Sequence, residues 1–330
     1  MNTLSLNSVH HGDCRFLLPR VSSESVALSV WSPPYYVGKD YEKDLSFEGW
    51  QKLLQKTISL HFPLIKPGGF LAINIADILC FKDHKMPKLM AENVSRRKVK
   101  LTREEIVKVK KDHPEWNRYK LAEFFGCSEQ TIDRRLNGNN IRGGKYQTQT
   151  RVFLVGGLIE KFAQEAGFHL YDRRVWVKDA AWENSQWHTI SYRAVDEFEY
   201  IYIFWKPGIT KIDRDRLTKD EWTNWGSRAV WSIRSVRSNS DHDSKFPVEL
   251  PRRLISLLTD SNEVILDCFM GSGTTALAAL SEQRQFIGIE KEKRSVEIAQ
   301  EAIAACKAAY DEPQQMELML RELEDKYHAG

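Results

Sequence analysis

Four residues at the end of an apolar run could do chemistry: Ser32, Pro33, Pro34 and Tyr35 follow directly after residues 26–31. The serine hydroxyl and the proline carbonyls can accept hydrogen bonds, whereas the two prolines have no backbone N–H to donate. The corner is therefore stiff, and acceptors dominate its rim. A strand that simply ends on a Pro-Pro pair would give the same pattern, so this corner alone does not decide between a site and a turn.

A glycine loop in the last third of the chain carries a second chemical signal. Residues 264–266 are apolar and predict a short buried strand, Gly271 and Gly273 predict a tight turn, and a helix follows. A second strand, residues 286–289, ends on Glu290, whose carboxylate could accept two hydrogen bonds from a ribose. This strand, loop, helix and strand unit predicts a nucleoside cofactor.

The residues around the loop distinguish between nucleoside cofactors. A phosphate-binding loop would carry a lysine after Gly273, and a dinucleotide fingerprint would carry a third glycine where this chain has Ala276. Asp267 stands in front of the loop, and its carboxylate could hold an ammonium group. A loop between Asp267 and Glu290 therefore favours S-adenosylmethionine.

Composition limits what positions these residues. The chain has 330 residues, 42% of them hydrophobic, which is enough for one large or two ordinary domains. No apolar run reaches the roughly 20 residues of a membrane helix, and the N-terminus lacks the features of a signal peptide, so we expect a cytoplasmic protein without a membrane partner. The five cysteines form no Cys-x-x-Cys pair and the nine histidines show no ligand spacing, so we expect no metal.

A basic segment, residues 95–151, holds fifteen Lys or Arg against seven Asp or Glu. Within it, residues 117–140 predict two short helices joined at Gly126, with Ser128 as the N-cap of the second. This pattern resembles a helix-turn-helix, whose second helix reads a DNA groove. The residues that this helix would present outward are Gln130, Thr131, Arg134 and Arg135. A helical insert that only packs on the main domain is the alternative.

The corner at residues 32–35 and the loop at residues 267–275 together resemble the catalytic and cofactor motifs of the amino-group DNA methyltransferases. Their order, with the catalytic motif first, resembles the beta class of that family, in which the doubly wound sheet is circularly permuted. Further matching pieces follow in order: His11-Gly12-Asp13, Lys66-Pro67-Gly68-Gly69, the late strand 198–204 and Lys245-Phe246-Pro247. The resemblance spans most of the chain outside roughly residues 80–150.

The resemblance implies an α/β fold with a doubly wound, mostly parallel, circularly permuted Rossmann-like sheet and a target-recognition region, whereas the helix-turn-helix-like insert departs from the minimal pattern of the family. With this insert, the chain is expected to divide as follows: 1–94 the catalytic half, 95–151 the basic insert, 152–205 late strands of the methyltransferase domain, 206–241 the target-recognition region and 242–330 the cofactor half. Residues 206–240 hold eight Lys or Arg against four acidic residues, interleaved with tryptophans. Trp225 and Arg228 could meet base edges there, or the tryptophans could form a local core.

The chemistry that the resemblance implies explains the corner. The lone pair of a nucleobase amine is delocalised into its ring, and acceptors such as the Ser32 hydroxyl and the Pro33 carbonyl could hold its hydrogens and favour the pyramidal, nucleophilic form. Tyr35 would stack on a base flipped out of the duplex. Methylation at cytosine carbon is disfavoured, because in its family the covalent adduct needs a Pro-Cys pair and no cysteine here follows a proline.

Ser32, rather than Asp, at the first position of the corner resembles the cytosine-N4 enzymes. Adenine-N6 methylation remains an alternative, and a DNA-binding regulator with an inert cofactor domain is a second. The implied partners are double-stranded DNA and a cognate restriction endonuclease. The cofactor residues carried over are Asp13 near the adenine, Phe246 and Pro247 near the methionine end, and Ser32, Asp267, Phe269, Gly271, Ser272, Gly273, Thr274 and Glu290.

Overall fold

The computed structural model describes residues 3–36, 45–87, 89–92, 100–136, 145–148, 150–179, 194, 196–236 and 246–310. Contacts divide the chain into two compact units. The first comprises residues 1–80, 152–182 and 196–330, and the second comprises residues 81–151 and 183–195. Lys245 and the predicted boundaries after residues 94 and 241 lie outside the described residues.

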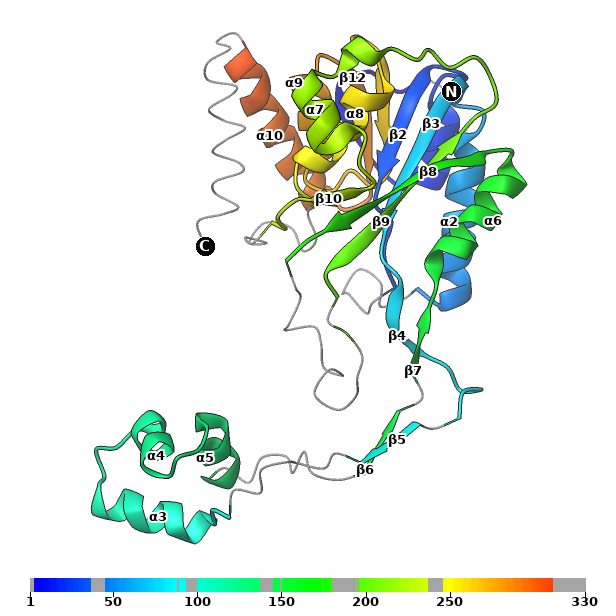
Figure 1. The fold of residues 1–330 in the computed structure, drawn as a ribbon. Coiled ribbons are helices and arrows are strands. Elements are labelled where there is room, and N and C mark those ends of the chain that lie inside the picture. The colour runs from blue at the N-terminus through cyan, green and yellow to red at the C-terminus, as the bar shows by residue number, and fades with distance from the viewer. Residues whose placement is uncertain are drawn as a thin grey trace. The chain divides into compact units, whose positions relative to one another are not determined.

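An eight-stranded sheet forms the centre of the first unit (Figure 1). Strand β9 runs antiparallel to its neighbours β3 and β8, and the other neighbouring strands are parallel. This confirms the predicted α/β class with a mostly parallel sheet. In order across the sheet the strands are β1 (Ser8–His11), β12 (Gln285–Glu290), β11 (Val264–Asp267), β2 (Val26–Trp31), β3 (Ile65–Ile75), β9 (Phe198–Trp205), β8 (His169–Val177) and β10 (Val230–Ser232).

The centre of the sheet joins two segments that are far apart in sequence. Every side chain of β2 is buried, as expected for a strand covered on both faces. β2 pairs in parallel with β11, and the Ser29 hydroxyl donates to the Leu266 carbonyl oxygen (2.9 Å) across 237 positions of sequence. The two strands that precede the predicted motifs are therefore neighbours, and their carboxyl ends meet at one edge of the sheet.

Helices form two groups on the sheet (Figure 1). α1 (Cys14–Leu17), α2 (Phe47–His61) and α6 (Val155–Ala166) pack in one group, and α8 (Glu249–Leu258), α9 (Thr274–Ser281) and α10 (Lys293–Tyr310) pack in the other. In α2 the buried residues Trp50, Leu54 and Ile58 recur every four positions, which is the spacing of one helix face. Short helical turns are η1 (Leu18–Arg20), η4 (Arg214–Arg216), α7 (Lys219–Glu221) and η5 (Trp222–Gly226). No helix among the described residues is long and apolar enough to span a bilayer.

The second unit contains the pair of helices predicted from residues 117–140. At the bend Gly126 has a φ of 58°, which lies in the left-handed region, and Ser128 Oγ accepts a hydrogen bond from the N–H of Thr131 (3.3 Å). The elements of this part of the chain are β4 (Ile78–Lys82), β5 (Leu89–Glu92), α3 (Arg103–Asp112), α4 (Arg118–Phe124), α5 (Glu129–Leu136), β6 (Lys145–Thr148) and β7 (Thr150–Phe153), with β4 paired to β7 and β5 to β6.

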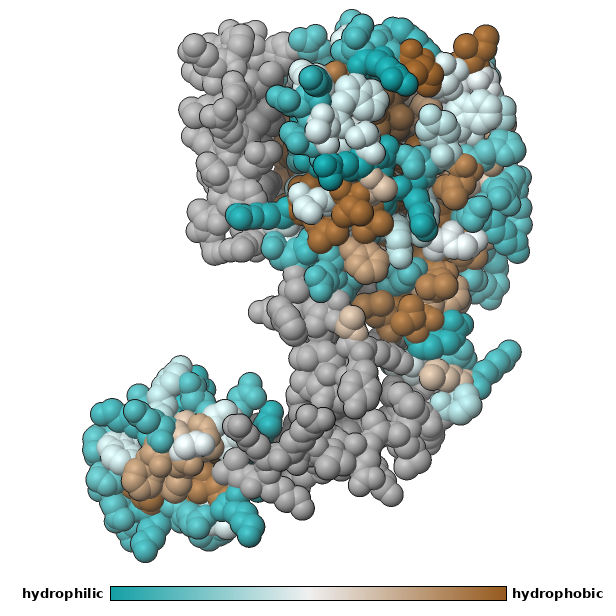
Figure 2. Space-filling view, in the orientation of Figure 1, coloured by the Kyte–Doolittle hydropathy of each residue, from teal (hydrophilic) through white to brown (hydrophobic). Residues whose placement is uncertain are grey.

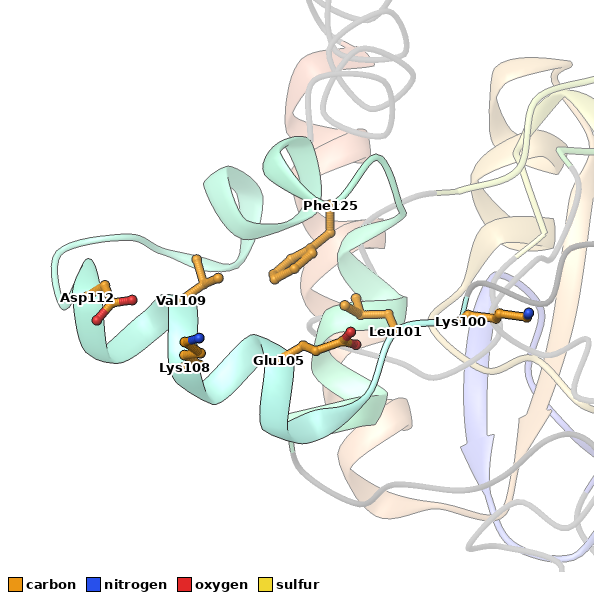
Figure 3. Close-up of a pocket in the computed structure, with 7 residues that line it drawn as sticks. All are labelled: Lys100, Leu101, Glu105, Lys108, Val109, Asp112 and Phe125. Atoms are coloured by element: carbon orange, nitrogen blue, oxygen red, sulfur yellow. The ribbon is translucent and has the colours of Figure 1, made fainter.

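The three helices of the second unit have a small core of their own. Its buried members are Leu101, Ile106, Leu121, Ala122 and Ile132. In Figure 2 apolar atoms lie in the middle of the visible face of this bundle, with hydrophilic side chains around them. Figure 3 shows the Phe125 ring directed toward α3, where the surface is hollowed by about 410 Å³.

Candidate active site

The two predicted motifs lie side by side at the carboxyl edge of the sheet. Trp31 ends β2 directly before the Ser-Pro-Pro-Tyr corner, and Phe269 belongs to the loop after β11. Their ring centroids are 5.4 Å apart. This aromatic contact brings the corner next to the glycine loop, so that molecules bound at the two motifs would lie close together.

Ser32 is the half-buried centre of the corner. Its Oγ lies 3.0 Å from the Asn74 carbonyl oxygen and 2.8 Å from the Tyr35 hydroxyl oxygen. The carbonyl can only accept, so the serine has a partner for its one proton inside the protein and keeps lone pairs for a substrate. The Pro34 carbonyl is already used, because it accepts from Trp50 Nε1 (2.6 Å), whereas no described residue donates to the Pro33 carbonyl.

A buried polar network holds the Tyr35 hydroxyl, and sequence reasoning missed its members. The hydroxyl donates to Glu199 Oε2 (2.6 Å), and Asn74 Nδ2 donates both to that carboxylate oxygen (2.6 Å) and to the tyrosine oxygen (2.8 Å). Lys178 Nζ lies 2.7 Å from Glu199 Oε1 and 3.3 Å from Asp196 Oδ2. Five side chains from β3, from the start of β9 and from the ends of β2 and β8 therefore converge behind the corner.

The charged groups of this network shift one another's pKa values. Burial alone would lower the pKa of Lys178, but the attraction of Glu199 and Asp196 raises it above its ordinary value. Burial raises the pKa of Asp196, with the nearby Glu199 carboxylate acting in the same direction. Lys178 is consequently a permanent cation beside Glu199.

Asp267 holds the glycine loop through two hydrogen bonds. Its side chain is 1% exposed, Oδ1 accepts the N–H of Phe269 (2.9 Å), and Oδ2 accepts the Thr275 hydroxyl (2.5 Å). Burial raises the pKa of Asp267 to about 7, even though both hydrogen bonds act to lower it. Both oxygens therefore accept hydrogen bonds from the loop itself, which gives Asp267 a role in holding the loop.

The loop glycines Gly271 and Gly273 and the Glu290 side chain form a candidate cofactor site, here called the cradle. Gly271 and Gly273 have φ values of 54° and 94°, and a Cβ on Gly273 would lie 3.1 Å from the Cβ of Ala299. Glu290 Oε2 accepts the Gly271 N–H (2.8 Å), and Oε1 accepts the N–H of Glu292 (2.8 Å). Each carboxylate oxygen keeps a lone pair for a hydroxyl. This exposed backbone beside an oriented carboxylate fits the ribose of a nucleoside cofactor.

The remaining predicted cofactor residues flank this cradle. Asp13 follows β1, and the neighbouring Gly12 N–H donates to the Glu290 carbonyl oxygen (2.8 Å). The Asp13 carboxylate binds the Arg15 guanidinium, with Nη2 to Oδ2 at 2.5 Å, and this bond lowers its pKa. Half-buried side chains are also found at Ser272 and Thr274 in the loop, and at Phe246 and Pro247, which precede α8.

The sequence as a whole matches the family of N6/N4 methyltransferases described as DNA methylase, over residues 26–301. It is 60% identical over 296 residues to the type II methyltransferase M.BglI of Bacillus subtilis, covering 90% of this chain and 85% of that protein. The chain is a DNA methylase of this family. It is also 31% identical over 307 residues to the type II methyltransferase M.Cfr9I of Citrobacter freundii, covering 90% and 88% of the two chains.

The solved structures of DNA methyltransferases share the fold of this methylase. The PvuII DNA methyltransferase, described as cytosine-N4-specific, superposes with a TM-score of 0.59 at 17% identity, covering 99% of this chain and 93% of that one. Enzymes of the family take the methyl group from S-adenosylmethionine, which is therefore the cofactor of this methylase. Among the described residues, no group of three or more His, Cys, Asp or Glu side chains is placed to hold a metal ion.

The predicted recognition region of the methylase needs a correction at Trp225. Its side chain is 5% exposed and packs edge to face on Trp231, whose Nε1 donates to the Trp225 carbonyl oxygen (2.9 Å). Arg253 lies over both rings. The prediction that Trp225 meets base edges is therefore wrong for this conformation, because the indole is part of a local core. Arg228 is exposed.

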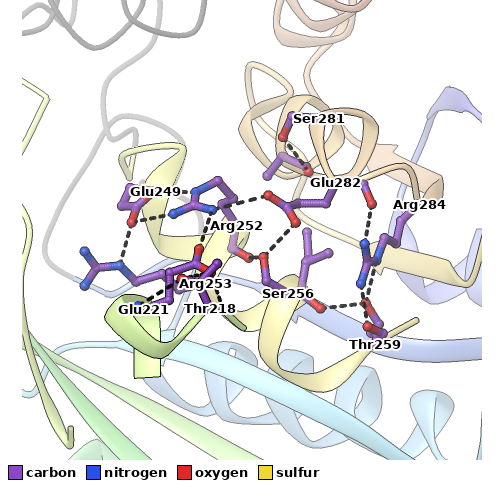
Figure 4. Close-up of polar contacts among 12 residues, drawn as sticks. Thr218, Glu221, Glu249, Arg252, Arg253, Ser256, Thr259, Ser281, Glu282 and Arg284 are labelled. Atoms are coloured by element: carbon purple, nitrogen blue, oxygen red, sulfur yellow. Dashed lines mark hydrogen bonds and ion pairs between the residues drawn. The ribbon is translucent and has the colours of Figure 1, made fainter. Parts of the chain in front are cut away.

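An ion pair joins this region to α8, within a cluster of charged side chains (Figure 4). Arg252 pairs with Glu249 (2.6 Å) and Glu282 (3.3 Å), and it approaches Glu221 of α7 (3.7 Å). Thr218 and Glu221 close a capping box on α7. The described part of the recognition region is thus bound to the catalytic unit and does not form a separate domain.

The second helix of the insert presents a polar face to solvent. Gln130 and Arg134 are exposed one turn apart, and Arg134 Nη2 donates to Gln130 Oε1 (3.3 Å). Arg135 is exposed beside them, whereas Thr131 is half-buried and lies 3.0 Å from the Ser128 hydroxyl. This face has the composition of a surface that contacts phosphates and base edges.

Proposed function

We propose that this methylase transfers a methyl group from S-adenosylmethionine to the exocyclic N4 amine of a flipped cytosine in a specific double-stranded DNA site. The observation that carries this proposal is the arrangement of acceptors at the corner. Ser32 finds protein partners for its own proton, and the Pro33 carbonyl has no described donor. A serine at this position, which resembles the cytosine-N4 enzymes, supports cytosine over adenine.

The residues of this chain would prepare the amine for attack. Ser32 Oγ and the Pro33 carbonyl oxygen would each accept one amine hydrogen, which favours the pyramidal nitrogen and frees its lone pair. Tyr35 would lie against the flipped base, with its ring direction fixed by the hydroxyl bond to Glu199. When bound, the cofactor supplies an electrophilic methyl group on its sulfonium.

The residues proposed to hold the cofactor keep separate roles. Glu290 would accept the ribose hydroxyls, while Gly271 and Gly273 allow the backbone to approach and Asp267 holds the loop in place. Asp13 would flank the adenine. Phe246 and Pro247 would flank the methionine end, together with the loop residues Phe269, Ser272 and Thr274.

Identifying the methylated nucleoside tests this proposal directly. The purified protein is incubated with S-adenosylmethionine carrying a labelled methyl group and with mixed-sequence duplex DNA, which is then digested to nucleosides. We expect the label on N4-methyl-2′-deoxycytidine. Label on N6-methyl-2′-deoxyadenosine would overturn the choice of base, and no label on any nucleoside would overturn the enzymatic proposal.

We propose that the exposed face of α5 contacts DNA through Gln130, Thr131, Arg134 and Arg135, with Arg228 as a further contact on the catalytic unit.

We expect the double change Arg134→Ala and Arg135→Ala to weaken duplex binding and to reduce the salt slope of log K by roughly 1 to 2, because two phosphate contacts are lost. The measurement is fluorescence anisotropy at several salt concentrations. Matched changes on α3, Lys108→Ala and Lys110→Ala, remove the same charge from another helix. An equal loss in both pairs would show that α5 has no special contact.

The proposed function implies a cellular compartment and a partner enzyme. The enzyme would act in the cytoplasm, where bacterial DNA lies. A type II methyltransferase protects a site that a restriction endonuclease cuts, so we propose a cognate endonuclease as its functional partner.

A further inference from the structure

The hydrogen bond between Ser32 and Tyr35 can run in two directions, and only one of them suits the proposed chemistry. The two oxygens are 2.8 Å apart, and each hydroxyl has a single proton. If Tyr35 donates, the tyrosine proton occupies one of the two lone pairs of Ser32, and only the other is left for the amine of the substrate. If Tyr35 accepts, both lone pairs of Ser32 remain available for the substrate.

Glu199 decides this direction. Its Oε2 lies 2.6 Å from the Tyr35 hydroxyl oxygen, and an ionised carboxylate can only accept. The tyrosine proton is therefore drawn to Glu199 and away from Ser32. Asn74 adds to this, because its Nδ2 donates to the tyrosine oxygen as well as to Glu199.

Lys178 forms an ion pair with this carboxylate in a buried place. The side chains of Glu199 and Lys178 are 9% and 15% exposed, and Nζ lies 2.7 Å from the second oxygen of Glu199. An unpaired charge at this depth would be costly, but the pair with Lys178 offsets the loss of hydration. Removing one partner would leave the other charge buried and uncompensated, so each charge of the pair depends on the other.

We propose that Glu199 is a positioning residue of methyl transfer, which acts through Tyr35 to keep the Ser32 hydroxyl free to accept a hydrogen from the target amine. The proposal rests on the proposed function of the corner. Glu199 touches neither cofactor nor base in this role. Glu199 sets the direction of the hydrogen bond between Ser32 and Tyr35. It thereby sets how many hydrogens Ser32, which would contact the base, can accept.

The change Glu199→Gln should reverse this bond without altering the shape of the site. Lys178 would attract the amide oxygen of the introduced glutamine, which turns its NH₂ group toward Tyr35. The tyrosine oxygen would then accept from this NH₂ group, and its proton would point to Ser32. We expect kcat to fall about tenfold, as a charge-assisted bond is replaced by a neutral one of opposite direction, while KM for the cofactor stays unchanged.

A double-mutant cycle with Tyr35→Phe separates this role from a structural one. Phenylalanine has no hydroxyl to donate to Ser32, so Glu199→Gln should lower kcat no further in the Tyr35→Phe background. The matched control is Glu263→Gln, which removes a carboxylate paired with Lys66 at the opposite edge of the same sheet and should leave kcat unchanged. Thermal unfolding of each variant reports whether it is folded.

A spectroscopic readout makes the test independent of turnover. The Raman difference spectrum between each protein and its Tyr35→Phe counterpart isolates the Fermi doublet of Tyr35, which reports whether a phenol donates or accepts. We expect the doublet of a strong donor in the wild type, where Tyr35 donates to a carboxylate, and of a weaker donor in Glu199→Gln, where its proton points to the Ser32 hydroxyl. An unchanged doublet, or losses of kcat that multiply in the double variant, would overturn the inference. A wild type with a donor Tyr35 that labels no nucleoside would overturn the proposed function while the assignment of the hydrogen bond stands.

Discussion

Replacing Ser32 by alanine is expected to lower kcat about 100- to 1000-fold, the range found when one preorganised hydrogen-bonding group is removed from a reacting centre. The change takes away an acceptor for the target amine and leaves the glycine loop and Glu290 in place. Cofactor affinity should therefore stay near the wild-type value. The two measurements are transfer of labelled methyl groups to DNA and calorimetric titration with S-adenosylmethionine.

Ser29 offers a matched control on the same strand. Its hydroxyl also donates to a backbone carbonyl, that of Leu266 at 2.9 Å, but it is fully buried between β2 and β11. Ser29→Ala should reduce the free energy of unfolding by about 1 kcal/mol and leave kcat unchanged. Equal activity losses in both variants would mean that Ser32 acts through the fold and not as an acceptor.

Cofactor binding is expected to weaken as the pH falls through about 7. Burial raises the pKa of Asp267 to about 7 in the free protein, and the positive charge of S-adenosylmethionine favours the ionised carboxylate. Below that pH, binding must release a proton, so the dissociation constant should rise by up to tenfold per pH unit. Calorimetric titrations from about pH 5.5 to about pH 7.5 measure this slope.

The stability of the free protein should depend on pH in the opposite direction to cofactor affinity. Because the pKa of Asp267 is raised on folding, the folded protein holds this proton more tightly than the unfolded chain does. Its contribution to the free energy of unfolding therefore falls as the pH rises from about 4 to about 7. Asp267→Asn should remove the pH dependence of cofactor affinity and that of the free energy of unfolding. Asp260→Asn, at the opposite edge of the sheet, should keep both. A wild-type affinity that is flat over this range would rule out Asp267 as the titrating group.

The chemistry-bearing motifs are readable from sequence because they are local. The Ser-Pro-Pro-Tyr corner and the glycine loop each lie within a few residues, and parallel pairing of β2 with β11 brings their ends to the same edge. Glu199 is different, since it is the second residue of the antiparallel strand β9. The start of that strand lies at the edge where its antiparallel neighbours β3 and β8 end. A single sequence contains no pattern that shows whether a residue at the beginning of a strand lies at the edge of the sheet that carries the catalytic residues.

Tertiary packing also decides what an individual side chain does. Trp225 and Arg228 are three positions apart in a basic, tryptophan-rich stretch, yet the indole is buried and the guanidinium is exposed. Asp267 stands before the glycine loop as predicted, but its oxygens are used by Phe269 and Thr275. Composition predicts that such residues gather in one region, and only the fold shows which of them face a ligand.

The pairing of β2 with β11 also bears on how the chain is made. Ser29 leaves the ribosome 237 residues before Leu266, which is a wait of about 10 to 50 s at common rates of synthesis. During that time the apolar strand β2 lacks the neighbour that completes its hydrogen bonds, and its open edge can recruit other chains. This separation along the chain leaves the nascent polypeptide open to aggregation, and its folding depends on contacts that form only after Leu266 has been made.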